Sequence, residues 1–246
     1  MKKIALLIAA AAMAVAFAGC KKQQKADNSL EALKARGVFV LGLDDSFPPM
    51  GFRNDDNEIV GFDIDLAKEV AARLGVEFKA QPIDWDAKEM ELSTGKIDCI
   101  WNGLTITPER EEALALTKAY LNNDQVLVVR NDGAIKTLAD AAGKKVGIQS
   151  GSSAQDAVEA NPDFKASLKE LVAFRENLTA LNDLETRGID GVVMDSIVAA
   201  YDIAQSGKPL TIVTEVLAKE GVGENTARQY AAAFAYVVEG GTLPNA

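Results

Sequence analysis

The chain alternates between two hydrophobic patterns: short apolar runs, and longer stretches whose apolar positions recur every three or four residues. The first pattern predicts buried strands and the second predicts amphipathic helices. The predicted strands cover residues 38–43, 76–81, 97–101, 125–130, 144–149, 171–174 and 188–194. The predicted helices cover residues 63–74, 84–95, 107–118, 154–160 and 178–186. Strands that alternate with helices in this way indicate an α/β protein.

The first of these helices follows a short apolar segment at 59–62. Asp63 is a suitable N-terminal cap, and Leu66, Val70 and Leu74 recur at four-residue spacing before Gly75, a typical helix-ending residue. We therefore expect Asp63 to cap the helix and the three apolar side chains to form its buried face.

Residues 97–110 combine a strand, a polar loop and a helix start. Thr107 is a good N-cap, and Pro108 fits the first helical position. Ligands of open α/β sheets bind in the crevice beyond the carboxyl ends of the strands. We expect Asn102, Gly103 and Thr105 to line such a crevice.

Arg110 falls in the first turn of that helix, where the helix dipole disfavours a cation. An anion bound between the guanidinium and the free N–H groups would resolve the conflict, and a planar guanidinium is a receptor for carboxylate or phosphate. The alternative is an Arg paired with a neighbouring Glu on a solvated face. This stretch alone does not separate the two interpretations.

Two earlier segments also lie just beyond a predicted strand. A loop at 44–50 begins with Asp44 and is stiffened by two prolines. Trp85 stands between two acidic residues near a helix start. We interpret Trp85 as a stacking face for a ligand, with surface packing as the alternative.

Two later loops carry hydroxyl and carboxylate groups. The run at 150–153 offers N–H groups and hydroxyls, among them those of Ser152 and Ser153, to an anion, although capping alone explains two of its serines. The run lacks the Lys of a phosphate-binding P-loop. Asp195 ends a strand where the next helix begins, so it is either an N-cap or a ligand-binding carboxylate.

The segments 94–98 and 186–190 share one pattern: a helix end, Gly, Ile-Asp, an apolar strand, a loop and a helix. This repeat indicates two lobes of similar construction that each direct one loop at a shared cleft. Arg110 and Asp195 would then face each other across that cleft. Such a pair suits a zwitterion, because desolvated charges must be paired.

The N-terminal twenty residues have the layout of a secretory signal. Lys2 and Lys3 precede an apolar run at 4–17 that is short for a membrane span, and small residues lead to Cys20. The end of this segment resembles the lipobox of bacterial lipoproteins, in which the Cys is lipidated; cleavage after residue 18 is the alternative. We expect a signal peptide at 1–19 and a lipid anchor with a flexible tether at 20–29.

Composition excludes several classes of function. The formal net charge of −10 argues against nucleic acid or an anionic membrane face as the ligand. The chain has no His, which excludes a Ser-His-Asp or Cys-His centre and a His-ligated metal, and we expect no cofactor. With Cys20 lipidated, Cys99 has no disulfide partner and is most simply a core residue. A length of 246 residues suffices for one large domain or two lobes.

Four motifs together resemble the family 3 solute-binding proteins of ABC transporters. The motifs are residues 61–67, 95–98, 104–110 and 147–153. The resemblance implies a two-lobed, periplasmic-binding-protein-like fold of type II with two crossover hinge segments. Those segments would fall near 121–125 and 206–211. Lobe one would then be discontinuous, 30–124 plus 208–246, and lobe two would be 125–207.

By position, the resemblance implies roles for residues of both lobes. Arg110 would hold the α-carboxylate of an amino acid together with N–H groups near Thr105 and Ser153. Asp195 would bind the α-ammonium, helped by the carbonyl of Gly103.

The same resemblance implies that Phe47 and Trp85 sandwich the ligand side chain and that Asp44 contacts its polar end. Asn102 departs from the family's pattern. Asp44, with Asp45 and Asp86 nearby, favours a basic side chain such as arginine or lysine, and glutamine and cystine remain open.

We therefore expect a monomeric receptor outside the cytoplasm, anchored through Cys20. It would close its lobes around one polar L-amino acid and pass it to an ABC permease in the cytoplasmic membrane. One alternative is an enzyme on the same fold, such as a dehydratase of cyclic acids, in which Asp44 or Asp195 would act as acid or base.

A second alternative is a receptor with impaired closure, and it follows from the C-terminal residues. Asn225 or Thr226 is expected to cap a helix with Tyr230, Phe234 and Val238 on one face. Relative to the family pattern, the sequence after this helix is shorter by a helix or more.

Overall fold

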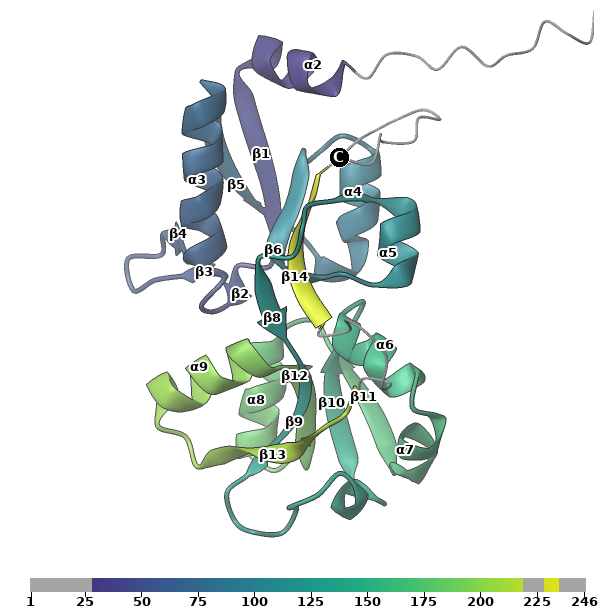
Figure 1. The fold of residues 1–246 in the computed structure, drawn as a ribbon. Helices are drawn as coiled ribbons and strands as arrows, with labels where there is room; N and C mark the ends of the chain where they lie inside the picture. Colours follow the sequence, from purple (N-terminus) through teal and green to yellow (C-terminus); the bar gives the residue numbers. More distant parts are fainter. Residues whose placement is uncertain (1–27, 219–227, 235–246) are drawn as a thin grey trace, which may run out of the picture.

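The computed structural model describes residues 28–218 and 228–234, which form two α/β lobes (Figure 1). The strands of the first lobe are β1 (Val38–Leu43), β2 (Ser46–Phe47), β3 (Gly51–Arg53), β4 (Ile59–Val60), β5 (Glu77–Pro82), β6 (Cys99–Thr105), β7 (Ala115–Leu116), β8 (Leu121–Asn123) and β14 (Arg228–Phe234). Its helices are α2 (Ser29–Arg36), α3 (Phe62–Leu74), the 3-10 turn η1 (Trp85–Ala87), α4 (Lys88–Ser93) and α5 (Pro108–Ala113).

The second lobe is built from one continuous stretch of chain. Its strands are β9 (Gln125–Arg130), β10 (Lys145–Gln149), β11 (Glu170–Phe174), β12 (Gly191–Asp195) and β13 (Leu210–Val216). Its helices are the 3-10 turn η2 (Ala139–Ala141), α6 (Ser153–Glu159), α7 (Pro162–Ser167), α8 (Asn177–Glu185) and α9 (Ser196–Ser206).

The two main sheets have the same plan. The first has the order β5-β1-β6-β14-β7, with β8 on β14, and the second has the order β11-β10-β12-β9-β13. In each sheet three parallel strands are followed by an antiparallel strand that comes from outside the parallel unit, β14 in one and β9 in the other. The arrangement confirms the predicted two-lobed α/β fold.

The central strands β6, β9 and β12 are almost entirely buried because helices cover both faces of each sheet. In β9, Val126 and Val128 pack toward α8 and α9, whereas Leu127 and Val129 pack toward α6. Residues that alternate between two buried faces give a continuous hydrophobic run, which is the pattern that identified this strand in the sequence.

The repeated segments at 94–98 and 186–190 adopt the same local structure. Gly95 and Arg187 occupy equivalent positions and both have a positive φ, of 72° and 68°. Asp98 accepts the N–H of Val40 in β1, and Asp190 accepts the N–H of Lys145 in β10. Each aspartate therefore fixes the start of its strand to the neighbouring parallel strand.

The expected cap of α3 is wrong. Gly61 occupies the N-cap position with φ 137°, and a Cβ there would lie 2.4 Å from the carbonyl oxygen of Met50, so only glycine fits. Asp63 lies inside the first turn, and its side chain is fully buried. Gly75 ends the helix as predicted.

The buried stripe of α3 also differs from the expected one. Ile64, Ala67 and Ala71 are fully buried, whereas Leu66 is 36% exposed and Val70 is partly buried. The difference arises because the carboxylate of Asp63 faces β6. Ala67 and Ala71 lie on the same side of the helix as Asp63 and are therefore buried with it.

Three predicted boundaries are corrected. The helix expected to extend to residue 118 ends at Ala113, because residues 115–116 pair with β14 as an edge strand. The expected linker at 122–124 is largely strand β8. Strand β13 pairs with β9, so residues 210–216 belong to the second sheet, and the chain returns to the first sheet later than the expected boundary at 207.

The expected C-terminal helix is wrong over residues 228–234, which form β14 and pair with β6, β7 and β8. Asn225, Thr226 and Val238 lie outside the described residues. The predicted signal peptide at 1–19 and Cys20 lie outside them as well. Within the part of the chain that is described, every helix is too short or too polar to cross a membrane.

Candidate functional site

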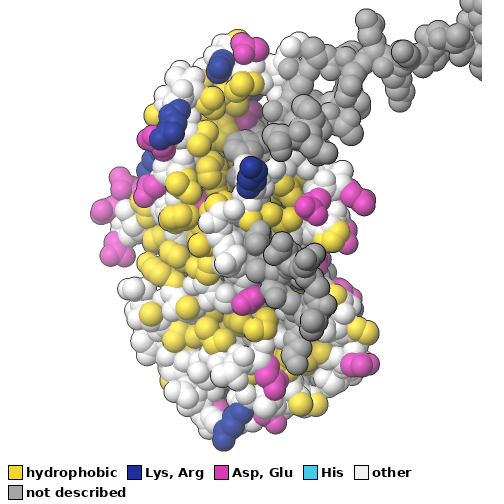
Figure 2. Space-filling view, in the orientation of Figure 1, with side chains coloured by type: hydrophobic (Ala, Val, Ile, Leu, Met, Phe, Trp, Pro, Cys, Tyr) yellow, Lys and Arg dark blue, Asp and Glu magenta, His cyan; other side chains and the backbone are white. Residues whose placement is uncertain are grey.

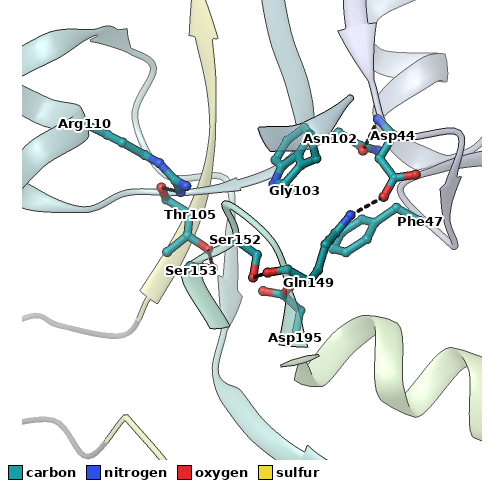
Figure 3. Close-up of a pocket in the computed structure, with 11 residues that line it drawn as sticks. Asp44, Phe47, Asn102, Gly103, Thr105, Arg110, Gln149, Ser152, Ser153 and Asp195 are labelled. Atoms are coloured by element: carbon teal, nitrogen blue, oxygen red, sulfur yellow. Dashed lines mark hydrogen bonds between the residues drawn. The ribbon is translucent and has the colours of Figure 1, made fainter. Parts of the chain in front are cut away.

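The carboxyl ends of the parallel strands of both lobes meet at one small cavity. It is lined by Asp44, Phe47, Trp85, Asn102, Gly103, Thr105, Arg110, Gln149, Ser152, Ser153 and Asp195 (Figure 3). Ten of these eleven residues are the site residues expected from the sequence, and Gln149 is the addition. Convergence at this edge follows from topology, since parallel strands that point the same way bring their ends together.

A bulge in β6 presents three of these residues. Between Ile100 and Leu104 the pairing of β6 with β14 shifts register, and Gly103 has φ 60°. A bulge redirects side chains that a regular strand would point elsewhere. Asn102, Gly103 and Thr105 therefore lie on an irregular strand and not on the expected loop.

Arg110 is a buried cation at the start of α5. Its N–H donates to the hydroxyl of Thr107, the predicted N-cap, and its Nη1 donates to the carbonyl of Thr105 at 2.8 Å. Burial lowers the pKa of Arg110, opposed by the negative charges of Glu89, Asp156 and Asp195. Among residues 28–218 no carboxylate forms an ion pair with Arg110. The alternative of a solvated Arg–Glu pair is therefore wrong.

Asp195 is a buried carboxylate from the other lobe. It occupies the N-cap position of α9 but makes no capping hydrogen bond. Its Oδ1 accepts hydrogen bonds from Asn123 Nδ2 at 2.5 Å and from Gln125 Nε2 at 2.6 Å. Asn123 and Gln125 flank the point where the chain crosses between lobes, so the crossing segment itself orients this carboxylate.

The two serines have different partners. Ser152 caps α6 by accepting the N–H of Gln155 and donates its own hydroxyl to the Gln149 carbonyl. The hydroxyl of Ser153 lies 3.0 Å from that of Thr105 in the first lobe and accepts a hydrogen bond from Gln125. Capping therefore accounts for Ser152 but not for Ser153.

Asp44 and Gln149 form a second contact between the lobes. Gln149 Nε2 donates to Asp44 Oδ2 at 2.6 Å, and Asp44 Oδ1 accepts the N–H and hydroxyl of Ser46. Gln149 also accepts a hydrogen bond from Asn177. Gln149 was not among the predicted site residues, because its sequence position marks it only as the last residue of a strand. Its place at a strand end is the signal that could have identified it.

The two aromatic residues are buried against opposite cores. Trp85 is 8% exposed and packs with Leu92 and Leu104 of the first lobe, so surface packing is excluded. Phe47 belongs to a cluster that includes Leu181 of α8 in the second lobe. Both rings also line the cavity.

Lys88 is a further buried cation near the cavity and was not predicted. It is 3% exposed, and its Nζ donates to the carbonyls of Trp85 at 3.2 Å and of Gly151 at 2.8 Å. Burial lowers the pKa of Lys88, and the nearby charge of Arg110 lowers it further. Gly151 belongs to the second lobe, so this contact also joins the lobes.

The lobes are closed on each other. The cavity has a volume of only about 10 Å³, the room for one water molecule. On the face in Figure 2, hydrophobic side chains of both lobes lie on either side of their junction. Phe52 of the first lobe contacts Tyr201 of the second in a tilted arrangement, with ring centroids 6.2 Å apart. A molecule larger than water enters only when the lobes part.

An acidic cavity of about 110 Å³ adjoins the first one and shares Asp44 and Trp85 with it. Its charged lining is Asp44, Asp45, Asp84 and Glu176, with Arg175 as the one cation among the lining residues. Excess negative charge in a partly enclosed space favours a cationic group.

Comparisons with known proteins agree with this geometry. A family model described as bacterial extracellular solute-binding proteins, family 3, matches residues 39–217. The L-cystine-binding protein TcyJ of Escherichia coli is 30% identical over 215 residues, which cover 86% of this chain and 79% of TcyJ. The arginine-binding extracellular protein ArtP of Bacillus subtilis is 28% identical, over 81% of this chain and 75% of ArtP.

A solved structure shares the fold closely. The substrate-binding protein of an ABC uptake transporter from Streptococcus pneumoniae, determined with bound histidine, has a TM-score of 0.78 and 36% identity. The similarity covers 85% of this chain and 83% of that chain. These three relatives are named as binding proteins and not as enzymes.

Proposed function

Because the chain belongs to the bacterial extracellular solute-binding proteins of family 3, we propose that it binds a polar L-amino acid outside the cytoplasm and delivers it to an ABC importer. The observation that carries this proposal is the pair Arg110 and Asp195. They are a buried cation and a buried anion that line one cavity from different lobes. A zwitterion between them would place its carboxylate against the guanidinium and its ammonium against the carboxylate, and charges at that depth are stabilised by such partners.

Each end of the amino acid then has its partners. Arg110 binds the α-carboxylate through guanidinium donors other than the Nη1–H that Thr105 accepts. The N–H groups near Thr105 and Ser153 complete that half of the site. Asp195 binds the α-ammonium with the carbonyl of Gly103. The bulge at Gly103 supports this role, because it interrupts the regular strand and makes a carbonyl available to a ligand.

The ligand side chain extends toward Asp44 between the rings of Phe47 and Trp85. Asn102 orients Asp44 by accepting its N–H at 2.9 Å, and Gln149 contacts its carboxylate from the other lobe. The adjoining acidic cavity shares Asp44 and Trp85 with the ligand cavity. We infer a preference for a basic side chain, consistent with the arginine and histidine named for ArtP and for the Streptococcus pneumoniae protein.

Binding proceeds by closure of the lobes. The ligand enters the open form, and the contacts of Asp44 with Gln149 and of Thr105 with Ser153 form or rearrange around it as the lobes meet. Closure presents both lobes together to the permease, and this closed form is the one that signals occupancy. The protein acts as a monomer and releases the ligand chemically unchanged.

The signal peptide at 1–19 directs export and is removed, and a lipid on Cys20 then holds the mature protein at the outer face of the membrane. Growth of an expressing bacterium with radioactive palmitate tests this location. The wild-type protein is expected to carry label, and Cys20→Ala is expected to carry none. Label retained by Cys20→Ala excludes this anchor.

The test of the proposed function is a thermal-shift panel of the twenty amino acids with cystine and ornithine. A ligand at about a thousand times its Kd stabilises the folded form by roughly 4 kcal/mol, which raises Tm on the order of 10 °C for a chain of this size. We expect such a shift from arginine or a related basic amino acid. A cooperatively melting protein that responds to no amino acid excludes the proposal.

A further inference from the structure

Asp63 is a buried carboxylate without a cationic partner among the described residues. It lies in the first turn of α3 with no exposed surface. Its Oδ2 accepts the N–H of Gly103 at 2.7 Å, and its Oδ1 accepts the hydroxyl of Tyr120 at 2.8 Å. These donors are neutral, so the carboxylate keeps its charge only at a substantial free-energy cost of desolvation. A purely structural role would not require a residue with that cost.

Both partners of Asp63 belong to parts of the molecule that ligand binding uses. Gly103 lines the cavity at the bulge of β6. Tyr120 immediately precedes β8, whose last residue, Asn123, donates to Asp195. Asp63 therefore connects the two groups proposed to bind the ligand's ammonium, the Gly103 carbonyl and the Asp195 carboxylate.

We propose that Asp63 is a positioning residue for the ligand ammonium, and that ligand binding requires its ionised form. The carboxylate fixes the β6 bulge through the N–H of Gly103, the residue whose carbonyl is proposed to bind the ammonium, and it fixes the approach to the crossing strand through the hydroxyl of Tyr120. This inference rests on the proposed function and deepens it, since it makes capture of the amino acid dependent on pH.

Among the groups that contact Asp63, only Asp63 itself is expected to change its protonation state between pH 5 and pH 7. Burial raises the pKa of Asp63 to about 6, although the hydrogen bonds from Tyr120 and Gly103 oppose the shift. Burial also raises the pKa of Tyr120 and of the Cys99 thiol on β6, and the charge of Asp63 adds to both shifts, so both stay neutral. Trp101, which packs edge-on against Tyr120, carries no charge.

The test measures the Kd of L-arginine by calorimetry between pH 5 and pH 7 for four proteins. In the wild type, Kd is expected to rise about tenfold from pH 7 to pH 5, because only about a tenth of Asp63 is ionised at the lower pH. Asp63→Asn keeps an oxygen that accepts the N–H of Gly103 but removes the charge. Its Kd is expected to be high and nearly independent of pH. Tyr120→Phe removes one donor, and its pH midpoint is expected to move upward.

The fourth protein is Asp65→Asn, a control on the same helix whose carboxylate is exposed. It is expected to reproduce the wild-type profile. If Asp63→Asn keeps the wild-type pH dependence, or if the wild-type Kd is constant over this range, the role of Asp63 is wrong and the proposed function stands. If the wild type does not bind L-arginine at pH 7, the basic-ligand proposal fails and the role of Asp63 falls with it.

Discussion

Lys88 of the first lobe donates a hydrogen bond from Nζ to the carbonyl of Gly151 in the second lobe at 2.8 Å. The ammonium is 3% exposed and does not line the ligand cavity. This contact exists only while the lobes are closed, so it contributes to the closed form and not to any one ligand.

Lys88→Met is therefore expected to weaken binding of every amino acid ligand by a similar factor. Loss of a hydrogen bond from a charged donor costs about 1.5 kcal/mol, or roughly tenfold in Kd. Calorimetry with two ligands of different side chain measures the factor. Lys96→Met, which removes an exposed ammonium of the same lobe that pairs with Glu91, is the matched control and is expected to bind normally. Tighter binding by Lys88→Met would show that burying the ammonium opposes closure.

Arg110→Ala is expected to abolish amino acid binding and to leave the fold intact. The guanidinium is the buried cation proposed for the α-carboxylate, and removing one partner of a buried ion pair costs about 3–5 kcal/mol, more than a hundredfold in Kd. Calorimetry measures the loss, and far-UV circular dichroism checks the fold. Arg36→Ala, which removes an exposed guanidinium paired with Asp98, is expected to bind like the wild type. Normal binding by Arg110→Ala would mean that the pocket is misplaced.

The sequence predicted the strand-end residues well because topology brings them together without fine detail. A residue that follows a parallel strand is carried to the same edge of the sheet as its counterparts, whatever the packing beneath it. Asp44 and Asp195 were placed at this edge by the rule, whereas Arg110 was singled out because a cation is unfavourable in the first turn of a helix. Gln149 obeys the rule too, but the prediction counted it as part of its strand.

The sequence predicted the structure poorly where a segment's conformation or burial depends on a partner that is distant in the chain. Residues 228–234 have apolar positions compatible with a helix, yet they form β14 because the open edge of β6 accepts a strand there. Lys88 was overlooked for a similar reason. Its burial depends on a carbonyl from the other lobe, which no local pattern reveals.

Asp44→Asn is expected to change ligand preference more than affinity in general. The substitution keeps an oxygen to accept the N–H of Ser46 but removes the charge that faces a basic side chain. Loss of one charge-assisted contact costs about 1.5–3 kcal/mol, so arginine is expected to bind at least tenfold more weakly, while glutamine changes little. The ratio of the two dissociation constants is the measurement. A proportional loss for both ligands would show that Asp44 acts through closure with Gln149 and not through the ligand side chain.

Trp85→Ala is expected to weaken binding less than Arg110→Ala and to alter the ranking of side chains in the thermal-shift panel. One side of the indole packs in the first-lobe core, so the variant is also expected to lose about 3 kcal/mol of stability or more. Ligand-free and ligand-bound melting temperatures separate the two effects. An unchanged ranking would assign Trp85 to packing alone.

The buried carboxyl of Asp63 predicts how stability without ligand depends on pH. Its pKa is raised to about 6 by burial, whereas an unfolded Asp titrates near 4. Between these values the folded protein binds more protons than the unfolded chain, so this group's stabilisation is complete below about pH 4 and is lost as the pH rises through 6. Two pKa units correspond to about 3 kcal/mol.

Urea unfolding at pH 4.5 and pH 7 measures the effect in the wild type and in Asp63→Asn. Relative to the wild type, the variant is expected to be more stable at pH 7 than at pH 4.5. A difference in unfolding free energy that does not change with pH would show that Asp63 does not titrate in this range.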